Sequence, residues 1–272
     1  MALISLASSS DAPGVTTTAL GLGHIWPRPV VVVEADSGRA TSFLPGYFRG
    51  ERPHGAGILE LAARLKEGPV TDEDLFSQVI SIGSNKWVLP GFHSPVAAIS
   101  ATSAWPALAE LFRGLESAGI DVIADLGRLA VNDARRPLFT RSDAALLMAV
   151  ADLPSLYALR MRLDDFHSQF EQDSSPAALG LILRARKGRP GYSDRDVRSA
   201  IALPHLGTIP HDGDMASVYS AGEDGGRKLS KSAFQRTLVS LANTITNGIT
   251  ARRSELGERS TSQAFDESET RS

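Results

Sequence analysis

The sequence predicts an α/β fold with a doubly wound, mostly parallel sheet of about seven strands and helices on both faces. Short apolar runs alternate with longer helical patterns along most of the 272 residues, which is typical of right-handed strand–helix–strand crossovers. Most of the runs are almost continuously apolar, as parallel strands are when helices cover both faces. Hydrophobic residues make up 42% of the chain and charged residues 22%, a composition that supports a sizeable core.

The predicted elements follow one another in this alternating order. The strands are expected at 3–7, 30–34, 79–82, 122–125, 145–150, 179–183 and 206–209. The helices are expected at 16–25, 58–66, 107–118, 155–170, 194–202 and 213–221, and a last helix at about 232–250. The segment 46–57 is rich in Gly, Pro and Arg and is expected to be an exposed loop.

The last helix places Phe234, Leu238, Leu241 and Ile245 on one stripe, a pattern that favours packing on the sheet over binding to a membrane surface. After residue 251 the sequence is polar and of mixed charge. We therefore expect a single domain over 1–251 and a disordered tail over 252–272.

Composition excludes several classes of function. The formal net charge is −3, which gives no indication of broad binding to nucleic acid, although a local basic patch stays open. The chain has no cysteine, so disulfides, thiolate zinc sites and cysteine nucleophiles are excluded. No secretory signal precedes the first strand, and no apolar run approaches the ~18 residues that cross a bilayer. These features predict a cytoplasmic protein without a transmembrane segment.

The most informative segment joins the first strand to the first helix. It reads Ser-Ser-Ser-Asp-Ala-Pro-Gly-Val-Thr-Thr-Thr over 8–18, in the strand–loop–helix order of a phosphate-binding loop, where backbone N–H groups and a helix N-terminus hold phosphates. A capped helix start without any ligand explains the loop equally well.

The loop resembles the K-G-G-x-G-K-T-T loop of the MinD/ParA-type P-loop ATPases. Gly14, Thr16 and Thr17 match its last glycine and its threonines, whereas Ser10 and Val15 stand where the family has lysines, and Asp11 and Ala12 replace two glycines. The resemblance implies nucleotide binding by Asp11, Ala12, Pro13, Gly14, Val15, Thr16 and Thr17. The loss of both lysines implies weak or absent binding of ATP and Mg²⁺.

Further segments of the chain resemble the same family in the right order. Asp36 follows the second strand at the second acid of the family's D-x-D, and Glu34 replaces the first. Asp125 ends an apolar strand as the family's Walker B acid does. The resemblance implies Thr16, Asp36 and Asp125 as magnesium ligands and Asp36 as the catalytic residue near the attacking water.

Near the C-terminus, Gly207-Thr208-Ile209-Pro210-His211-Asp212 resembles the family's G-x-I-P-x-D strand end, which implies that Pro210 contacts the nucleotide. Arg184 stands where many members have an adenine-reading asparagine, so adenine selection is in question. Arg184, Arg186, Lys187 and Arg189 form a basic cluster, which is explained by a solvated loop or by contact with a phosphate, DNA or an acidic partner.

The sequence lacks the residue patterns of zinc sites, serine hydrolases and dinucleotide-binding proteins. The six histidines form no close pair that would hold zinc. The sequence contains no G-x-S-x-G elbow, and no G-x-G-x-x-G follows the first strand, so hydrolase and dinucleotide-binding readings have little to support them.

Three hypotheses follow from the resemblance. The first is a degenerate, homodimeric organiser, similar to the CpaE/TadZ-like proteins, that recruits a protein partner in positioning, partitioning or division and turns over little or no ATP. The second is an active ATPase in which a cation such as Lys228 or Arg128 replaces the lost lysine. The third is an interaction scaffold that binds no nucleotide.

Overall fold

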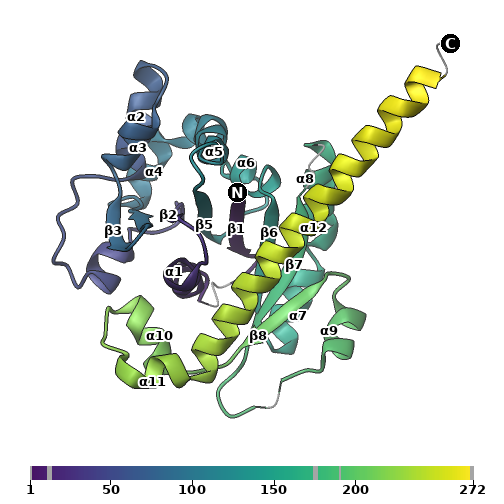
Figure 1. Ribbon diagram of the computed structural model, residues 1–272. Helices are drawn as coiled ribbons and strands as arrows, with labels where there is room; N and C mark the ends of the chain where they lie inside the picture. Colours follow the sequence, from purple (N-terminus) through teal and green to yellow (C-terminus); the bar gives the residue numbers. More distant parts are fainter. Residues whose placement is uncertain (1, 11–13, 174–176, 190, 270–272) are drawn as a thin grey trace.

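In the computed structural model, residues 2–10, 14–173, 177–189 and 191–269 are described, with side chains up to residue 255. Within these residues eight strands form one sheet in the order β3-β4-β2-β5-β1-β6-β7-β8 (Figure 1). All neighbouring strands are parallel except β3, which is antiparallel to β4. Their bounds are β1 Leu3–Ser8, β2 Val30–Glu34, β3 Ile80–Gly83, β4 Lys86–Leu89, β5 Asp121–Arg128, β6 Ala144–Val150, β7 Ala178–Arg184 and β8 His205–Ile209. The predicted fold class is confirmed.

The eighth strand, β4, was not predicted. It is only four residues long and forms a hairpin with β3 through a tight turn in which Asn85 has a positive φ of 56°. Its sequence, Lys-Trp-Val-Leu, is too short to show a strand pattern by itself. Pairing with β2 as well as β3 makes it a strand, so tertiary contacts decide this element.

Helices cover both faces of the sheet (Figure 1). One face carries η1 (Phe43–Tyr47), α1 (Val15–Ile25), α10 (Gly213–Ser220), α11 (Gly226–Lys231) and α12 (Ala233–Glu269). The other carries α2 (Ile58–Glu67), α3 (Asp72–Phe76), α4 (Pro95–Ser100), α5 (Trp105–Gly114), α6 (Arg136–Thr140), α7 (Leu153–Arg160), α8 (Leu163–Gln172) and α9 (Asp194–Ala200). A short 3-10 turn, η2 (Thr102–Ala104), precedes α5.

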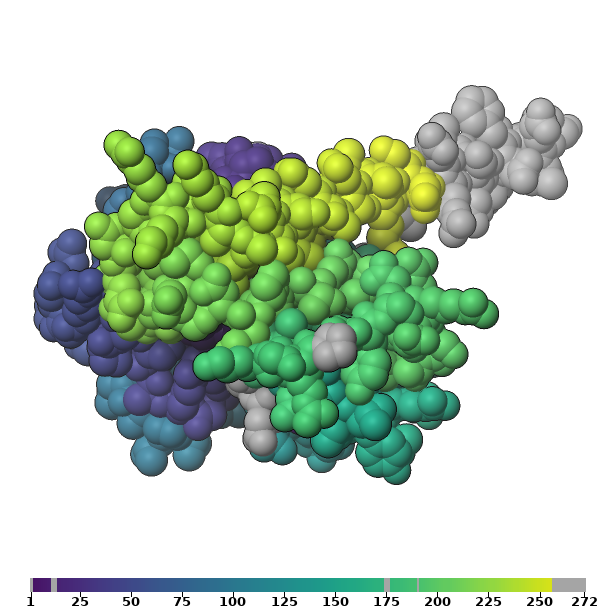
Figure 2. Space-filling model, turned by 90° about the horizontal axis from the view of Figure 1, so that it is seen from below, coloured from purple at the N-terminus to yellow at the C-terminus, as the bar shows by residue number. Residues whose placement is uncertain are grey.

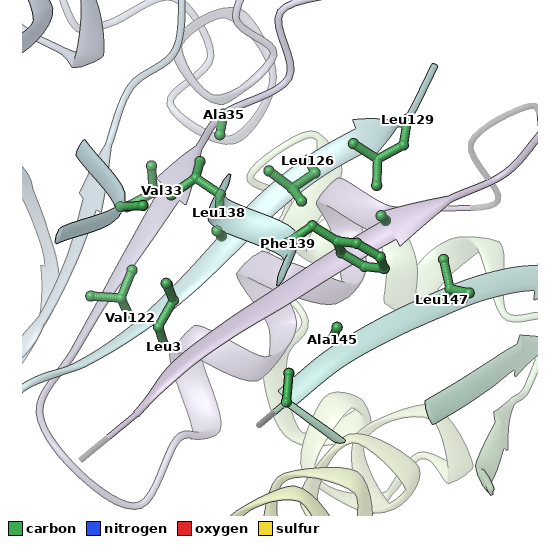
Figure 3. Close-up of a cluster of buried hydrophobic side chains, with 14 of the residues drawn as sticks. Leu3, Val33, Ala35, Val122, Leu126, Leu129, Leu138, Phe139, Ala145 and Leu147 are labelled. Atoms are coloured by element: carbon green, nitrogen blue, oxygen red, sulfur yellow. The ribbon is translucent and has the colours of Figure 1, made fainter. Parts of the chain in front are cut away.

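The strands contribute side chains to two separate hydrophobic cores, one on each face of the sheet, because successive side chains point to opposite faces. In β2, Val31 and Val33 belong to one buried cluster, and Val30 and Val32 to the other. Figure 3 shows the first cluster, in which Phe139 lies among side chains of the central strands. Burial on both faces explains the continuous apolar runs in the sequence.

Several helices differ from their predicted bounds. The single helix expected at 155–170 is two helices, α7 and α8, and the short α3, α4, α6 and α11 were missed. The expected loop 46–57 begins in the π-helical turn η1. The last helix runs to Glu269 instead of about residue 250, so its backbone is helical across the predicted boundary at 251. The division into a domain and a disordered tail stays a prediction.

Up to residue 255, α12 packs its predicted apolar stripe onto the sheet face, with Leu238 and Leu241 fully buried. It lies beside α10 and α11 on the surface shown in Figure 2. None of the helices in the described part of the chain is long and apolar enough to cross a membrane.

Candidate functional site

The candidate site lies at the carboxyl edge of the sheet, where the central strands β2, β5 and β1 end side by side. In the register, Glu34 of β2 and Leu6 of β1 are both opposite Asp125 of β5. Ligands of open α/β sheets bind at this edge because loops and helix N-termini converge there. The predicted site residues that are described belong to this edge, and Asp11, Ala12 and Pro13 lie outside the described residues.

The turn into α1 has the geometry of a glycine turn. Gly14 has a φ of 87°, in the left-handed region that favours glycine, and its carbonyl accepts a hydrogen bond from Thr18 N at 2.9 Å. No side chain caps this helix N-terminus among the described residues. Val15, at the position of the lost lysine, is fully buried in the apolar cluster under α1.

Thr16 lies beside the acids at the ends of β2 and β5. Its hydroxyl accepts a hydrogen bond from the Arg39 guanidinium, whose Nε also contacts Asp36 Oδ2 at 2.9 Å. Arg39 therefore bridges two residues that the resemblance assigns to magnesium. No pattern in the sequence marked Arg39, although its spacing of three residues from Asp36 allows a local ion pair.

Asp36 has a second cationic neighbour. Arg135 Nη1 lies 3.8 Å from Asp36 Oδ1, and the Arg135 side chain is only 3% exposed. Arg135 also donates to the carbonyl of Ala35 at 3.2 Å and pairs with Asp133 at 2.7 Å. The backbone N–H of Gly38 donates to Asp36 Oδ1 at 2.9 Å. Asp36 is thus held as a buried, charge-compensated carboxylate.

Asp125 is in a different environment although it is next to Asp36. It is fully buried, and one oxygen accepts from Gly127 N at 2.9 Å, whereas Oδ2 has no partner among the described residues. Burial raises the pKa of Asp125 to about 7. This value is the net result of several causes: the carboxylates of Asp36 and Glu34 act in the same direction as burial, while the Thr16 hydroxyl and the charge of Arg39 act against it.

The carboxylate of Glu34 has a structural role, since both of its oxygens accept hydrogen bonds from the chain. Its carboxylate accepts from Ser42 N at 2.5 Å, Ser42 Oγ at 2.9 Å, Phe43 N at 3.3 Å and Gly91 N at 3.0 Å, and also from Thr41 Oγ1. These five donors fix the loop after β2 against the end of β4. The acid that replaces the first position of the family pattern therefore positions the loop that carries Arg39.

A cavity of about 210 Å³ opens on the other side of α1, where Gly14 and Thr17 face Pro210 and Arg184. The walls are completed by Thr18, Ile209, His211, Asp212, Gly213, Ala216 and Phe234. Arg184 Nη1 contacts His211 Nδ1 at 3.2 Å, and its Nε is buried without a partner among the described residues. This free donor is next to the helix N-terminus, so the cavity is suited to an anionic or polar ligand.

A fourth arginine, Arg162, holds the neighbouring loops together. Arg162, at the start of α8, donates to the carbonyls of Ser9 at 3.3 Å, Leu129 at 2.6 Å and Ala130 at 3.1 Å. The loops after β1 and β5 are thereby tied to one helix. Sequence reasoning missed Arg135 and Arg162 because many of their partners are backbone carbonyls, such as those of Ala35 and Ser9, that approach them only in the folded chain.

The predicted residues thus divide into two groups. Thr16, Asp36 and Asp125 come together on one side of α1, and Gly14, Thr17 and Pro210 on the other, while Val15 faces the core. The two substitute cations considered from the sequence are not in these groups: Arg128 is exposed at the end of β5, and Lys228 belongs to α11. Among the described residues, Arg39 and Arg135 lie beside Asp36 in the first group, and Arg184 lies beside the second.

The residues expected to hold magnesium do not fit that ion as they are arranged. Mg²⁺ prefers octahedral oxygen ligands, yet Thr16 and Asp36 are hydrogen-bonded to Arg39. Of the three acids described at this edge, only Asp125 has an oxygen without a hydrogen-bond partner. Among the described residues no group of three acidic, histidine or cysteine side chains is arranged to hold a metal ion.

The strand order and the glycine turn at this edge define a doubly wound, mostly parallel α/β protein. No family model and no curated protein matches the chain, but solved structures do. A ParA family ATPase from Chlorobium tepidum superposes with a TM-score of 0.71 at 16% identity, over 88% of this chain and 97% of that one.

Two further structures give the same result. MinD from Pyrococcus horikoshii, solved with Mg-ADP, has a TM-score of 0.67 at 17% identity, over 92% of this chain and 97% of its own. A variant of McdA from Cyanothece in complex with ATP has a TM-score of 0.67 at 17% identity, over 92% and 95%. The chain has the fold of the MinD/ParA-type P-loop ATPases, as its sequence predicted.

Proposed function

We propose that this protein is a MinD/ParA-like spatial organiser that recruits a protein partner and turns over little or no ATP. The burial of Val15 carries the proposal. A side chain that is 0% exposed in the apolar cluster under α1 offers no charge to a phosphate at the position where the family has a lysine.

The magnitude of this loss can be bounded. A hydrogen bond to a charged group contributes roughly 1.5–3 kcal/mol, and each 1.4 kcal/mol changes an equilibrium constant about tenfold. The replacement of two lysines by Ser10 and Val15 therefore weakens phosphate binding by about two orders of magnitude or more. Transition-state charge on a transferred phosphoryl group loses the same contacts, so turnover falls as well.

Residual nucleotide binding is part of the proposal. We assign contacts to the loop residues Asp11, Ala12, Pro13, Gly14, Thr16 and Thr17 and to Pro210. The Nε of Arg184, which has no partner in the described part of the chain, lies beside Gly14 and Thr17 and supports an anionic ligand there. Asp36, which the resemblance implies is catalytic, is compensated by Arg39 and Arg135, an arrangement that favours a structural over a catalytic role.

An exposed stripe on α7 supports partner binding. Leu153 is 71% exposed, Tyr157 66% and Met161 57%. Their spacing of four residues places them on one side of the helix. Val96, Ile99 and Val131, which follow other strands at the same edge, are also exposed. Grouped exposed apolar side chains mark interaction surfaces, and we assign the stripe of Leu153, Tyr157 and Met161 to a homodimer that then recruits the partner.

A solved MinC:MinD complex shows that one protein of this fold assembles with another protein. By analogy, the partner of this chain belongs to a positioning, partitioning or division system, including the pilus or secretion machines of CpaE/TadZ-like proteins. A cytoplasmic location accords with these neighbours. The net charge of −3 does not favour nucleic acid as the partner.

Nucleotide titration and turnover of the purified protein test the proposal. We expect weak ATP binding that Arg184→Gln reduces further, with ATP hydrolysis near background. The matched control is Arg189→Gln, which removes an arginine from the exposed end of the same basic cluster. ATP hydrolysis as fast as that of an intact MinD/ParA-type ATPase assayed in parallel would reject the degenerate assignment. An unchanged melting temperature in millimolar ATP and ADP would instead favour the scaffold that binds no nucleotide.

A further inference from the structure

The guanidinium of Arg39 lies between the Thr16 hydroxyl and the Asp36 carboxylate. Its Nε is 2.9 Å from Asp36 Oδ2, and a terminal nitrogen donates to Thr16 Oγ1. From this geometry we propose that Arg39 takes the place of a divalent cation at this edge, so that the site binds phosphate-bearing ligands without Mg²⁺. The first part, exclusion of the metal ion by Arg39, is independent of the proposed function. The second part, binding of phosphate without Mg²⁺, rests on the proposed function because it requires that nucleotide binds.

Competition for oxygen atoms supports the exclusion. A magnesium ion coordinated by Thr16 and Asp36 would have to displace two hydrogen bonds of Arg39, one of them part of an ion pair. Asp36 already has Arg135 as a second cation at 3.8 Å. Adding a divalent charge beside two guanidinium groups is opposed by electrostatic repulsion at these distances.

The third carboxylate at this edge offers no alternative. Both oxygens of Glu34 accept hydrogen bonds from the chain, including Ser42 N at 2.5 Å and Gly91 N at 3.0 Å. Of the acids that the structure describes at this edge, Asp125 is the one with an oxygen that accepts no hydrogen bond. One free oxygen is insufficient for an ion that usually takes one or two carboxylates in addition to ligand phosphates.

Arg39 is also placed to contact a ligand. Its side chain is 45% exposed, and its Nη1 makes no hydrogen bond to the described residues. A guanidinium fork binds phosphate with two parallel hydrogen bonds. Arg39 can therefore keep Asp36 and Thr16 on one side and present a donor pair to a phosphate on the other.

Binding of Mn²⁺, a paramagnetic substitute for Mg²⁺, tests the first part by electron paramagnetic resonance in the absence of nucleotide. We expect no bound Mn²⁺ for the wild type or for Arg39→Lys, which keeps the charge. Arg39→Ala frees Thr16 and Asp36 and is expected to bind Mn²⁺ at least about tenfold more tightly. That binding should disappear when Asp125→Ala is added. Arg128→Ala, which removes an exposed arginine at the same edge, is the control and should resemble the wild type.

Binding of Mn²⁺ by the wild type at this edge would overturn the inference, and so would an Arg39→Ala protein that folds, as judged by its melting curve, but binds no Mn²⁺. The second part is tested by ADP titration with Mg²⁺ and with EDTA. Equal affinity in both conditions supports it, and loss of binding in EDTA refutes it. If ADP does not bind in either condition, the nucleotide part of the proposed function fails, while the Mn²⁺ result still decides the role of Arg39.

Discussion

Replacing Asp125 by asparagine should make this protein more stable at neutral and alkaline pH. The pKa of Asp125 is raised to about 7 by burial, from an ordinary value of 3.8. A carboxyl whose pKa is higher in the folded state binds its proton more tightly when folded. Its contribution to stability is therefore fully present below pH 3.8 and is lost as the pH rises towards 7.

The size of the effect follows from the shift. Each unit of pKa corresponds to about 1.36 kcal/mol, so charging Asp125 costs about 4 kcal/mol over the whole window. About 2 kcal/mol of this falls between pH 5.5 and 7. Asparagine keeps an oxygen for the 2.9 Å hydrogen bond from Gly127 N and cannot ionise.

Urea unfolding at several pH values measures the difference. The free energy of unfolding of Asp125→Asn minus that of the wild type should rise by about 2 kcal/mol between pH 5.5 and 7 and level off above pH 7.5. Asp36→Asn is the contrast, because this carboxylate is compensated by Arg39 and Arg135, and its removal should destabilise the protein throughout. A difference for Asp125→Asn that stays constant from pH 5.5 to 8 would show that the carboxyl titrates normally and would refute the reasoning.

Three other predictions concern separate parts of the molecule. Gly127 has a φ of 55°, and a Cβ there would collide with the Asp36 carboxylate; Gly127→Ala should lower the free energy of unfolding by about 3 kcal/mol. Gly188→Ala is its control, because Gly188 has a φ of 65° in open space and should lose only about 1 kcal/mol from backbone strain; equal losses would show that the collision is relieved. Burial lowers the pKa of His24 to about 4, with Lys86 acting in the same direction. Stability from neutral His24 should therefore be lost as the pH falls from 6.5 to 4, by about 3 kcal/mol. When the urea midpoint is measured at decreasing pH, His24→Phe should lose less stability than the wild type. An unchanged dependence of the midpoint on pH would contradict this assignment. His93→Phe, at an exposed histidine, serves as the control. Tyr157→Asp on α7 should shift a dimer towards monomer in sedimentation without changing the melting temperature of the monomer, because the side chain is 66% exposed. Tyr192→Asp, at an exposed residue outside α7, is the control and should leave the association state unchanged. If Tyr157→Asp associates like the wild type, α7 is not part of the interface.

Much of the fold was predictable because its strongest signals are local. Strands such as β2, with four consecutive valines, and helices such as α1 and α2 were predicted within one or two residues at each end. By contrast, β4 was missed because four residues show no periodicity and its pairing partners are distant in sequence. The break between α7 and α8 was missed for a related reason, since no proline or glycine marks it.

The candidate site was predictable where it depends on strand ends. Asp36 and Asp125 follow or end apolar strands, and parallel neighbours bring such ends to one edge. Their different chemistry was not predictable, because it depends on which carboxylate receives a cation. The structure gives Asp36 two guanidinium neighbours, whereas one oxygen of Asp125 has no partner within the residues described.

The predicted effect of Asp125→Asn therefore depends both on the sequence and on the tertiary structure. The sequence by itself determined the order of strands and helices, the glycine turn at Gly14, the acids at the sheet edge and the absence of a lysine at residue 15. Only the tertiary structure decided that Arg39 bridges Thr16 and Asp36 and that Arg184 lines the cavity beside Gly14. The physical reason is the separation in sequence between the residues that interact. Burial and backbone patterns are encoded locally, whereas the charge near a buried carboxylate depends on loops that meet only when the crossovers pack.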